Sequence, residues 1–148
     1  MKIAFLLVIT LVSTFAGCAT TSVAISNPPS DVQLVYQSVH IVNHGGNSAD
    51  MDANMQREFL THGFVVKAGA DEGGHGGADL IVRYADDWKW DIAMYLRSLD
   101  LMVYNAQAGS LIATGRWKNS AFHGFYSSEK VVTQVVNDTL VRANILQQ

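Results

Sequence analysis

The first half of the chain shows the hydrophobic pattern of a strand, a helix and a second strand. From Val32 to Val42, β-branched and aromatic residues predict a strand, with a change of phase near Tyr36 that we interpret as a β-bulge. A helix is indicated next by apolar residues at every fourth position, namely Met51, Met55 and Phe59. Ser48 or Asn47 can cap this helix and Gly63 can end it. The run from Phe64 to Lys67 is then a short strand.

The second half predicts three strands joined by turns and a closing helix. Apolar and polar residues alternate over 79–90, 94–104 and 111–118, which favours an antiparallel meander. The link Asn105–Gly109 has the composition of a hairpin turn, with Gly109 in the left-handed region. Ser127 can cap a final helix, whose apolar stripe has helical spacing: Val132, Val135, Val136, Leu140 and Ala143.

This order of elements predicts an α+β fold. We expect a two-layer sandwich, in which a mostly antiparallel sheet of about five strands carries both helices on one face. The other face also carries large apolar side chains, so part of it is expected to be a contact surface.

The N-terminal segment has the anatomy of a secretory signal. Of the first 17 residues, 12 are hydrophobic. A single positive charge at Lys2 comes before the main apolar run, and small residues follow that run before Cys18. A helix that spans a bilayer needs about 20 apolar residues, and the run from Ile3 to Val12 is shorter. We therefore expect residues 1–17 to be a signal peptide that is removed.

The only cysteine of the chain stands at the end of this signal. The sequence Phe15-Ala16-Gly17-Cys18 resembles the lipobox of bacterial lipoproteins, although that pattern usually begins with Leu. The resemblance implies that Cys18 is lipidated and becomes the first residue of the mature protein. Because Ala19 rather than Asp follows it, the resemblance also implies sorting to the outer membrane, on its periplasmic side. Residues 18–30 are small, polar and end in Pro-Pro, so we expect a lipidated cysteine and tether there and a single domain over 31–148.

A second resemblance involves the middle of the chain. The strand 79–84, followed by Trp90-Asp91-Ile92 and Tyr95-Leu96, is similar to a family of uncharacterised bacterial lipoproteins that pair a lipobox with a small α+β envelope domain. The resemblance extends over most of the mature chain and implies no biochemical activity.

Charge and glycine content exclude two classes of site. The chain has 10 basic and 13 acidic residues without a basic cluster, so we expect no nucleic-acid partner. The glycine-rich segment 69–77 lacks the Gly-Lys-Ser/Thr ending of a phosphate-binding loop and is interpreted as a connector.

Candidate catalytic and metal-binding residues do not form a recognisable constellation. His40 and His44 flank the end of a strand, where about 13 Å of extended chain separates them. Ser120 and His123 lack a nucleophile elbow. The carboxylates of Asp86, Asp87 and Asp91 are interpreted as a solvated turn. We therefore expect a protein that is not an enzyme and holds neither a metal nor another cofactor.

Aromatic residues remain as the candidate binding site. Trp88 and Trp90 share a face if they lie in a strand, and Phe122, Phe125 and Tyr126 gather before the last helix. We expect Trp90 and Trp117 in the core, and Trp88 on the surface. The sequence thus predicts a lipid-anchored envelope protein that binds another envelope protein or a second copy of itself. The alternative is a protein that binds glycan, peptidoglycan or a small molecule through these aromatic residues.

Overall fold

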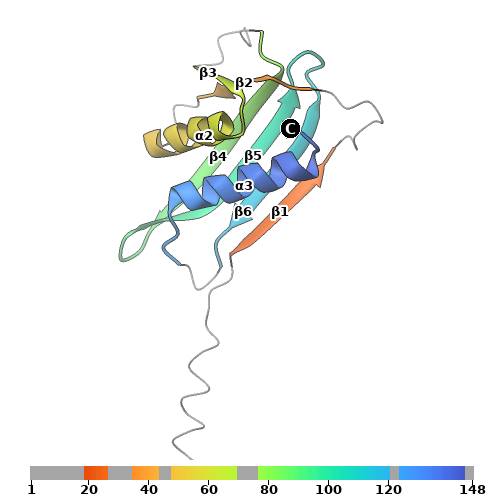
Figure 1. Ribbon diagram of the computed structural model, residues 1–148. Helices are drawn as coiled ribbons and strands as arrows, with labels where there is room; N and C mark the ends of the chain where they lie inside the picture. The colour runs from red at the N-terminus through yellow and green to blue at the C-terminus, as the bar shows by residue number, and fades with distance from the viewer. Residues whose placement is uncertain (1–18, 27–34, 44–47, 70–76, 121–123, 146–148) are drawn as a thin grey trace, which may run out of the picture.

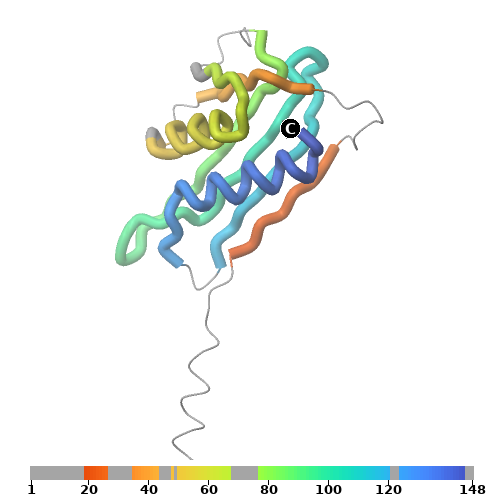
Figure 2. Tube along the Cα trace, in the orientation of Figure 1, coloured from red at the N-terminus to blue at the C-terminus, as the bar shows by residue number. Residues whose placement is uncertain are grey.

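The α+β class predicted from the sequence is confirmed. The structure is a computed structural model that describes residues 19–26, 35–43, 48–69, 77–120 and 124–145. Six strands form one sheet in the order β1-β6-β5-β4-β2-β3, and two helices, α2 and α3, lie against the same face of it (Figure 1). The trace in Figure 2 shows α3 crossing the sheet over β1, β6 and β5, with α2 beside it.

The sheet is mixed. β4 (Leu80–Trp90), β5 (Met94–Asn105) and β6 (Leu111–Lys118) form the expected antiparallel meander. β2 (Ser38–Val42) is parallel both to β4 and to β3 (Val65–Gly69). Within the described residues, Tyr36 precedes β2 and does not form a bulge in it.

The sixth strand is a correction to the expected tether. β1 (Thr20–Ile25) pairs antiparallel with β6, from Thr20 opposite Lys118 to Ile25 opposite Ala113. The Thr21 hydroxyl also accepts a hydrogen bond from Gln134 on α3 at 2.8 Å. The folded domain therefore includes Thr20–Ile25 and does not begin near residue 31, because this small and polar segment completes the edge of the sheet.

The helix between β2 and β3 forms where the sequence predicts it. In α2 (Ala49–Thr61) the hydroxyl of Ser48 accepts a hydrogen bond from the Met51 N–H at 3.3 Å, which caps the helix. Gly63 adopts φ +87° after the last turn, a conformation that favours glycine. Met51, Met55 and Phe59 are completely buried, so the four-residue repeat is the face that packs on the sheet.

The second helix, α3 (Ser128–Arg142), lies close to the sheet. Its predicted stripe is buried, with Val132, Val135, Val136 and Leu140 in the core. Gly115 of β6 lies directly beneath it: a methyl group there would overlap Oγ1 of Thr139 and lie 3.1 Å from Val135 Cγ1. Ser127 stands at the N-cap position but makes no side-chain capping hydrogen bond, contrary to the expectation.

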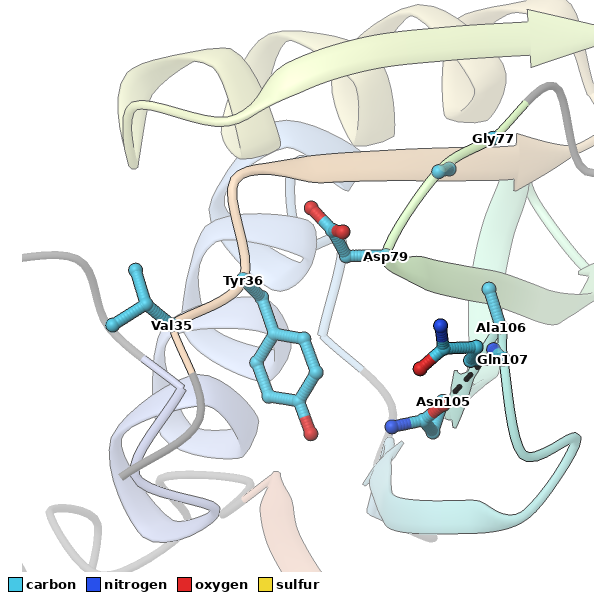
Figure 3. Close-up of a pocket in the computed structure, with 8 residues that line it drawn as sticks. Val35, Tyr36, Gly77, Asp79, Asn105, Ala106 and Gln107 are labelled. Atoms are coloured by element: carbon cyan, nitrogen blue, oxygen red, sulfur yellow. Dashed lines mark hydrogen bonds between the residues drawn. The ribbon is translucent and has the colours of Figure 1, made fainter. Parts of the chain in front are cut away.

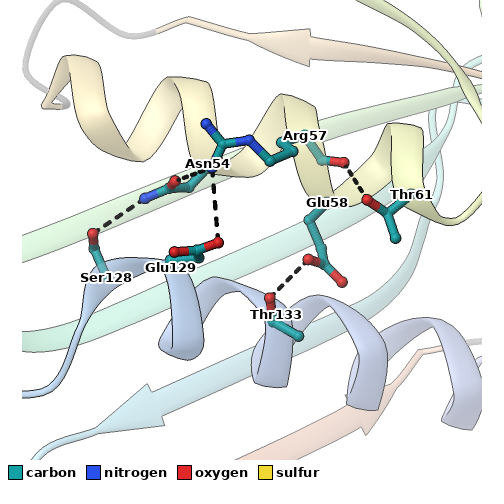
Figure 4. A network of polar contacts seen from close by, with 7 residues as sticks. All are labelled: Asn54, Arg57, Glu58, Thr61, Ser128, Glu129 and Thr133. Atoms are coloured by element: carbon teal, nitrogen blue, oxygen red, sulfur yellow. Dashed lines mark hydrogen bonds and ion pairs between the residues drawn. The ribbon is translucent and has the colours of Figure 1, made fainter.

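Polar side chains join the two helices above the core (Figure 4). The Asn54 amide donates to the Ser128 hydroxyl at 3.1 Å, and the Thr133 hydroxyl donates to Glu58 at 2.7 Å. Glu58 also lies 3.2 Å from His62, one turn further along α2. The first two of these contacts link α2 to α3. None of the described helices is long and apolar enough to cross a membrane.

Candidate interaction surfaces

The β4–β5 hairpin extends beyond the two helices (Figure 1). Its end carries exposed apolar residues. Trp90 is 72% exposed and pairs across the hairpin with Met94, which is 53% exposed. Ile92, in the turn between the strands, is 86% exposed. A hydrogen bond of 3.2 Å from the Asp91 N–H to the Ala93 carbonyl helps close the turn. The end of the hairpin thus presents three large apolar side chains to solvent.

Two aromatic residues before α3 lie near this hairpin. Phe125 is 60% exposed, and its ring meets that of Tyr95 edge-on with the ring centres 6.3 Å apart. Tyr126 is 38% exposed and packs in the same way on buried Trp117 at 5.4 Å. We call the set of Trp90, Ile92, Met94, Phe125 and Tyr126 the tip patch.

Asn119 holds the segment before α3 in place. Its buried side chain donates to the carbonyls of Leu96 and Gly124 at 3.0 and 2.9 Å, and accepts from the N–H groups of Ser120 and Gly124. All of these partners are backbone groups, so one side chain ties Gly124 to the end of β6 and to Leu96 of β5.

The structure changes the roles expected of the tryptophans. Trp117 is buried as expected, whereas Trp90 is exposed and its expected place in the core is wrong. Trp88, expected on the surface, is half-buried against the core, and its Nε1–H donates to the Asp86 carboxylate at 2.7 Å. Trp88 pairs with Leu96, and Trp90 pairs with Met94 nearer the end of the hairpin. The two tryptophans share a face of the strand, so their different burial follows from their position along the hairpin. Phe122 lies outside the described residues.

The start of β1 lies at the same end of the molecule as the tip patch. Thr20 of β1 pairs with Lys118 of β6, which in turn pairs with Ser98 of β5. Met94, at the start of β5, lies four residues before Ser98. The Asn119 N–H donates to the Arg97 carbonyl at 2.9 Å, which continues this row. Figure 1 shows the start of β1, the hairpin and the start of α3 together at the lower end. Cys18 itself lies outside the described residues, two positions before Thr20.

A second candidate surface is the edge and open face of the sheet. Neither β1 nor β3 has a described strand on its outer side. On the open face next to β1, side chains of four strands line a shallow groove of about 610 Å³, namely Ser22, Ala24, Ala85, Asp100, Met102, Thr114 and Arg116. Arg116 and Asp100 form an ion pair at 3.1 Å in it. The groove is therefore polar at its centre and flanked by small residues.

An open pocket of about 500 Å³ lies at the opposite end, around Tyr36, Asp79 and Asn105 (Figure 3). One oxygen of Asp79 accepts from the N–H groups of Gln37 and Ser38 and from the Ser38 hydroxyl, each at 2.9 Å. The Gln37 N–H, then the Ser38 groups and the Lys67 charge, lower the pKa of Asp79 below its ordinary 3.8, although partial burial opposes them. Asp79 thus ties β2 to the start of β4, and we interpret its role as structural.

The other polar candidates from the sequence are not brought together among the described residues. His40 is buried in β2, while His44 and His123 lie outside the described part of the chain. Asp86 accepts the hydrogen bond of Trp88, and Asp87 lies 3.7 Å from Lys89 and 3.5 Å from Arg97. No group of three His, Cys, Asp or Glu side chains in the described segments could hold a metal ion.

Sequence comparisons give no relative. No protein-family model matches the chain, and no curated protein sequence matches it.

Comparison of folds gives distant neighbours. The structure is similar to PelC from Paraburkholderia phytofirmans, described as a dodecamer, with a TM-score of 0.59, 11% identity and coverage of 88% of this chain and 100% of PelC. A point variant of that PelC, also a dodecamer, gives a TM-score of 0.56 at 9% identity and the same coverage. At these identities the likeness shows a common fold and nothing more.

Proposed function

We propose that this chain is a lipid-anchored protein of the bacterial cell envelope, sorted to the periplasmic side of the outer membrane, and that its domain is a non-enzymatic assembly module. The signal-like residues 1–17 and the lipobox-like sequence ending in Cys18 support the anchor. Strand β1 supports a close attachment, because only Ala19 separates it from that cysteine. The domain would then stand directly on the membrane surface.

The observation that carries the assembly role is the outer edge of β1. The Ser26 N–H donates to Ile112 of β6 at 2.9 Å, and N–H groups alternate sides along a strand. The N–H groups of Thr21, Val23 and Ile25 therefore point away from the sheet. Exposed edges are usually protected by lysine, proline or a bulge. β1 contains neither lysine nor proline, and no strand among the described residues pairs with its outer side, so this edge can accept another strand.

A second copy of the chain is the partner that we favour for this edge. The outer side of β3, at the other end of the sheet, also has no described strand against it. Contact between unlike edges of successive copies produces a closed ring or a filament. PelC, which shares the fold, is described as a dodecamer, and we propose a closed oligomer for this chain as well.

The test is the oligomeric state of the full-length protein in mild detergent, measured by chemical crosslinking and light scattering. The double variant Ser22→Lys and Ala24→Lys places two charges beside the open edge at exposed positions, and we expect it to be monomeric. The matched control, Gln107→Lys and Ala108→Lys, adds the same charge in the β5–β6 turn and should assemble like the wild type. A wild-type protein that stays monomeric at every concentration would contradict the proposal.

The alternative function, binding of glycan, peptidoglycan or a small molecule, is supported by the exposed Trp90 ring, which can stack on a sugar. Titration of the detergent-solubilised protein with soluble peptidoglycan fragments tests it through tryptophan fluorescence. A saturable change that Trp90→Phe abolishes would favour this alternative.

A further inference from the structure

We propose that the tip patch inserts into the interfacial layer of the bilayer that carries the anchor, so that the domain is held at the membrane by two points. This inference rests on the proposed function for the anchor at Cys18, and it goes beyond it by naming what the tip patch contacts.

The first argument is the chemistry of the patch. Its members are large apolar or amphipathic side chains, and tryptophan and tyrosine are the residues most enriched where membrane meets water. The most exposed of them, Ile92 and Trp90, lie at the end of the hairpin. Single exposed apolar residues are common on protein surfaces, but the tip patch gathers five at one end of the molecule.

The second argument is the length of chain between the anchor and the sheet. One residue, Ala19, separates Cys18 from β1, so a lipid on that cysteine leaves the domain little freedom to turn away. The end of the sheet that holds Thr20 and its partner Lys118 must then face the membrane. This is the end at which the hairpin and the segment before α3 lie (Figure 1).

The third argument is reach. Met94 lies four residues beyond Ser98, which is level with Lys118 and Thr20, so the hairpin projects about 13 Å past the start of β1. Cys18 lies two residues before Thr20, or about 7 Å away if the chain is extended. The end of the hairpin, with Trp90, Ile92 and Met94, therefore reaches at least as far toward the membrane as the residue that carries the lipid.

Charge around the patch is nearly balanced. Described charged residues on and beside the hairpin have both signs and pair with one another: Asp87 lies 3.7 Å from Lys89 and 3.5 Å from Arg97, and Glu129 lies 3.9 Å from Arg57. Paired charges of this kind give little net attraction to anionic lipid, so apolar insertion has to hold the tip. We therefore expect the contact to persist in high salt and on vesicles of neutral lipid.

The experiment measures whether the lipid chains reach Trp90. Full-length protein is reconstituted into phosphatidylcholine vesicles with or without brominated acyl chains, which quench nearby tryptophans. The chain has three tryptophans, of which Trp117 is buried and Trp88 is half-buried. We expect quenching of the wild type, loss of most of it in Trp90→Phe, and retention of it in the matched control Trp88→Phe.

Two results would overturn the proposal. The first is equal lipid quenching, or none, in the wild type and in Trp90→Phe. The second is shielding of Trp90 from aqueous iodide without quenching by brominated lipid, which would mean that a protein surface covers the patch. Crosslinking of the same vesicles reports self-assembly separately, so a failed membrane contact and a failed assembly role give different results.

Discussion

Substitution of Gly115 by alanine tests the close packing of α3 on the sheet. The added methyl group would overlap Oγ1 of Thr139, which is fully buried and donates to the Val135 carbonyl at 2.7 Å. Neither the hydroxyl nor the helix can move without breaking this bond or lifting α3. Overpacking of this kind costs about 1 to 3 kcal/mol, and we expect about 2 kcal/mol for Gly115→Ala.

The partner substitution removes the obstacle. Thr139→Ala loses the buried hydroxyl and a methyl group, at a cost of about 1 to 2 kcal/mol. In that background the nearest neighbour of a methyl group at position 115 is Val135 Cγ1 at 3.1 Å, which has to move by only a few tenths of an ångström. Alanine also lowers the entropy of the unfolded chain relative to glycine, which is worth about 0.5 to 1 kcal/mol. The single variants together should lose about 3 to 4 kcal/mol and the double variant only about 1 kcal/mol, a coupling of about 2 to 3 kcal/mol.

The assay is urea unfolding of the chain from residue 19 onward, followed by far-ultraviolet circular dichroism with the slope compared between variants. Gly109→Ala is the matched control: Gly109 has φ +67° and nothing within 4 Å, so its cost of about 1 kcal/mol should be additive with Thr139→Ala. If the losses from Gly115→Ala and Thr139→Ala also add within about 0.5 kcal/mol, the close contact does not explain the glycine.

Four further substitutions, which make three predictions, have defined outcomes. Trp88→Ala should lower the free energy of unfolding by about 2 kcal/mol, because it removes the packing of a half-buried ring and its hydrogen bond to Asp86. Trp90→Ala should change the free energy of unfolding by less than about 0.5 kcal/mol, because this side chain is exposed. Equal losses for the two variants in thermal unfolding would be inconsistent with the structure. Asn119→Asp cannot donate to the carbonyls of Leu96 and Gly124 and should cost about 2 kcal/mol, measured by urea unfolding, so an unchanged midpoint would rule out the bridging role. The pKa of Asp79 is lowered in the folded state, so the stability that its carboxylate contributes should be complete above the ordinary pKa of 3.8 and lost as the pH falls through the lower folded-state value. Asp79→Asn should therefore be less stable than the wild type at neutral pH and equally stable in strong acid. A difference in stability that persists in acid would refute this.

Local patterns predicted the helices and the meander because each carries its own signal. The repeat of Met51, Met55 and Phe59 identified the buried face of α2, and Gly63 marked its end. The alternation over 111–118 coincides with β6. In these elements one face is buried and the other is exposed, so the spacing of apolar residues along the sequence indicates which face is buried.

The sequence did not predict β1, because an edge strand of small residues carries little such signal. Most of the side chains from Thr20 to Ile25 are exposed, and the strand exists through its pairing with β6, which is distant in sequence. The β-branched run near Val23 is the one local hint, and a polar stretch before Pro28 and Pro29 outweighed it.

The tip patch could be predicted only in part. The sequence identified Trp90, Phe125 and Tyr126 as candidate contact residues, but alternation gives the face of a strand and not the place where the covering helix ends. Trp88 and Trp90 share a face, yet the first packs on the core and the second lies beyond it. Ile92 and Met94 belong to the patch because the hairpin is long enough to extend beyond the helices. No pattern in the sequence indicates that length.

The lipid on Cys18 is the central claim, because both the assembly on the membrane and the insertion of the tip patch depend on it. The most direct measurement is metabolic labelling of cells with an alkyne analogue of palmitate, comparing the wild type with Cys18→Ser, together with the intact mass of the mature chain. We expect label in the wild type, none in Cys18→Ser, and a mature chain that begins at Cys18 with lipid attached. An unlabelled wild-type chain, released in soluble form after cleavage elsewhere, would contradict the account.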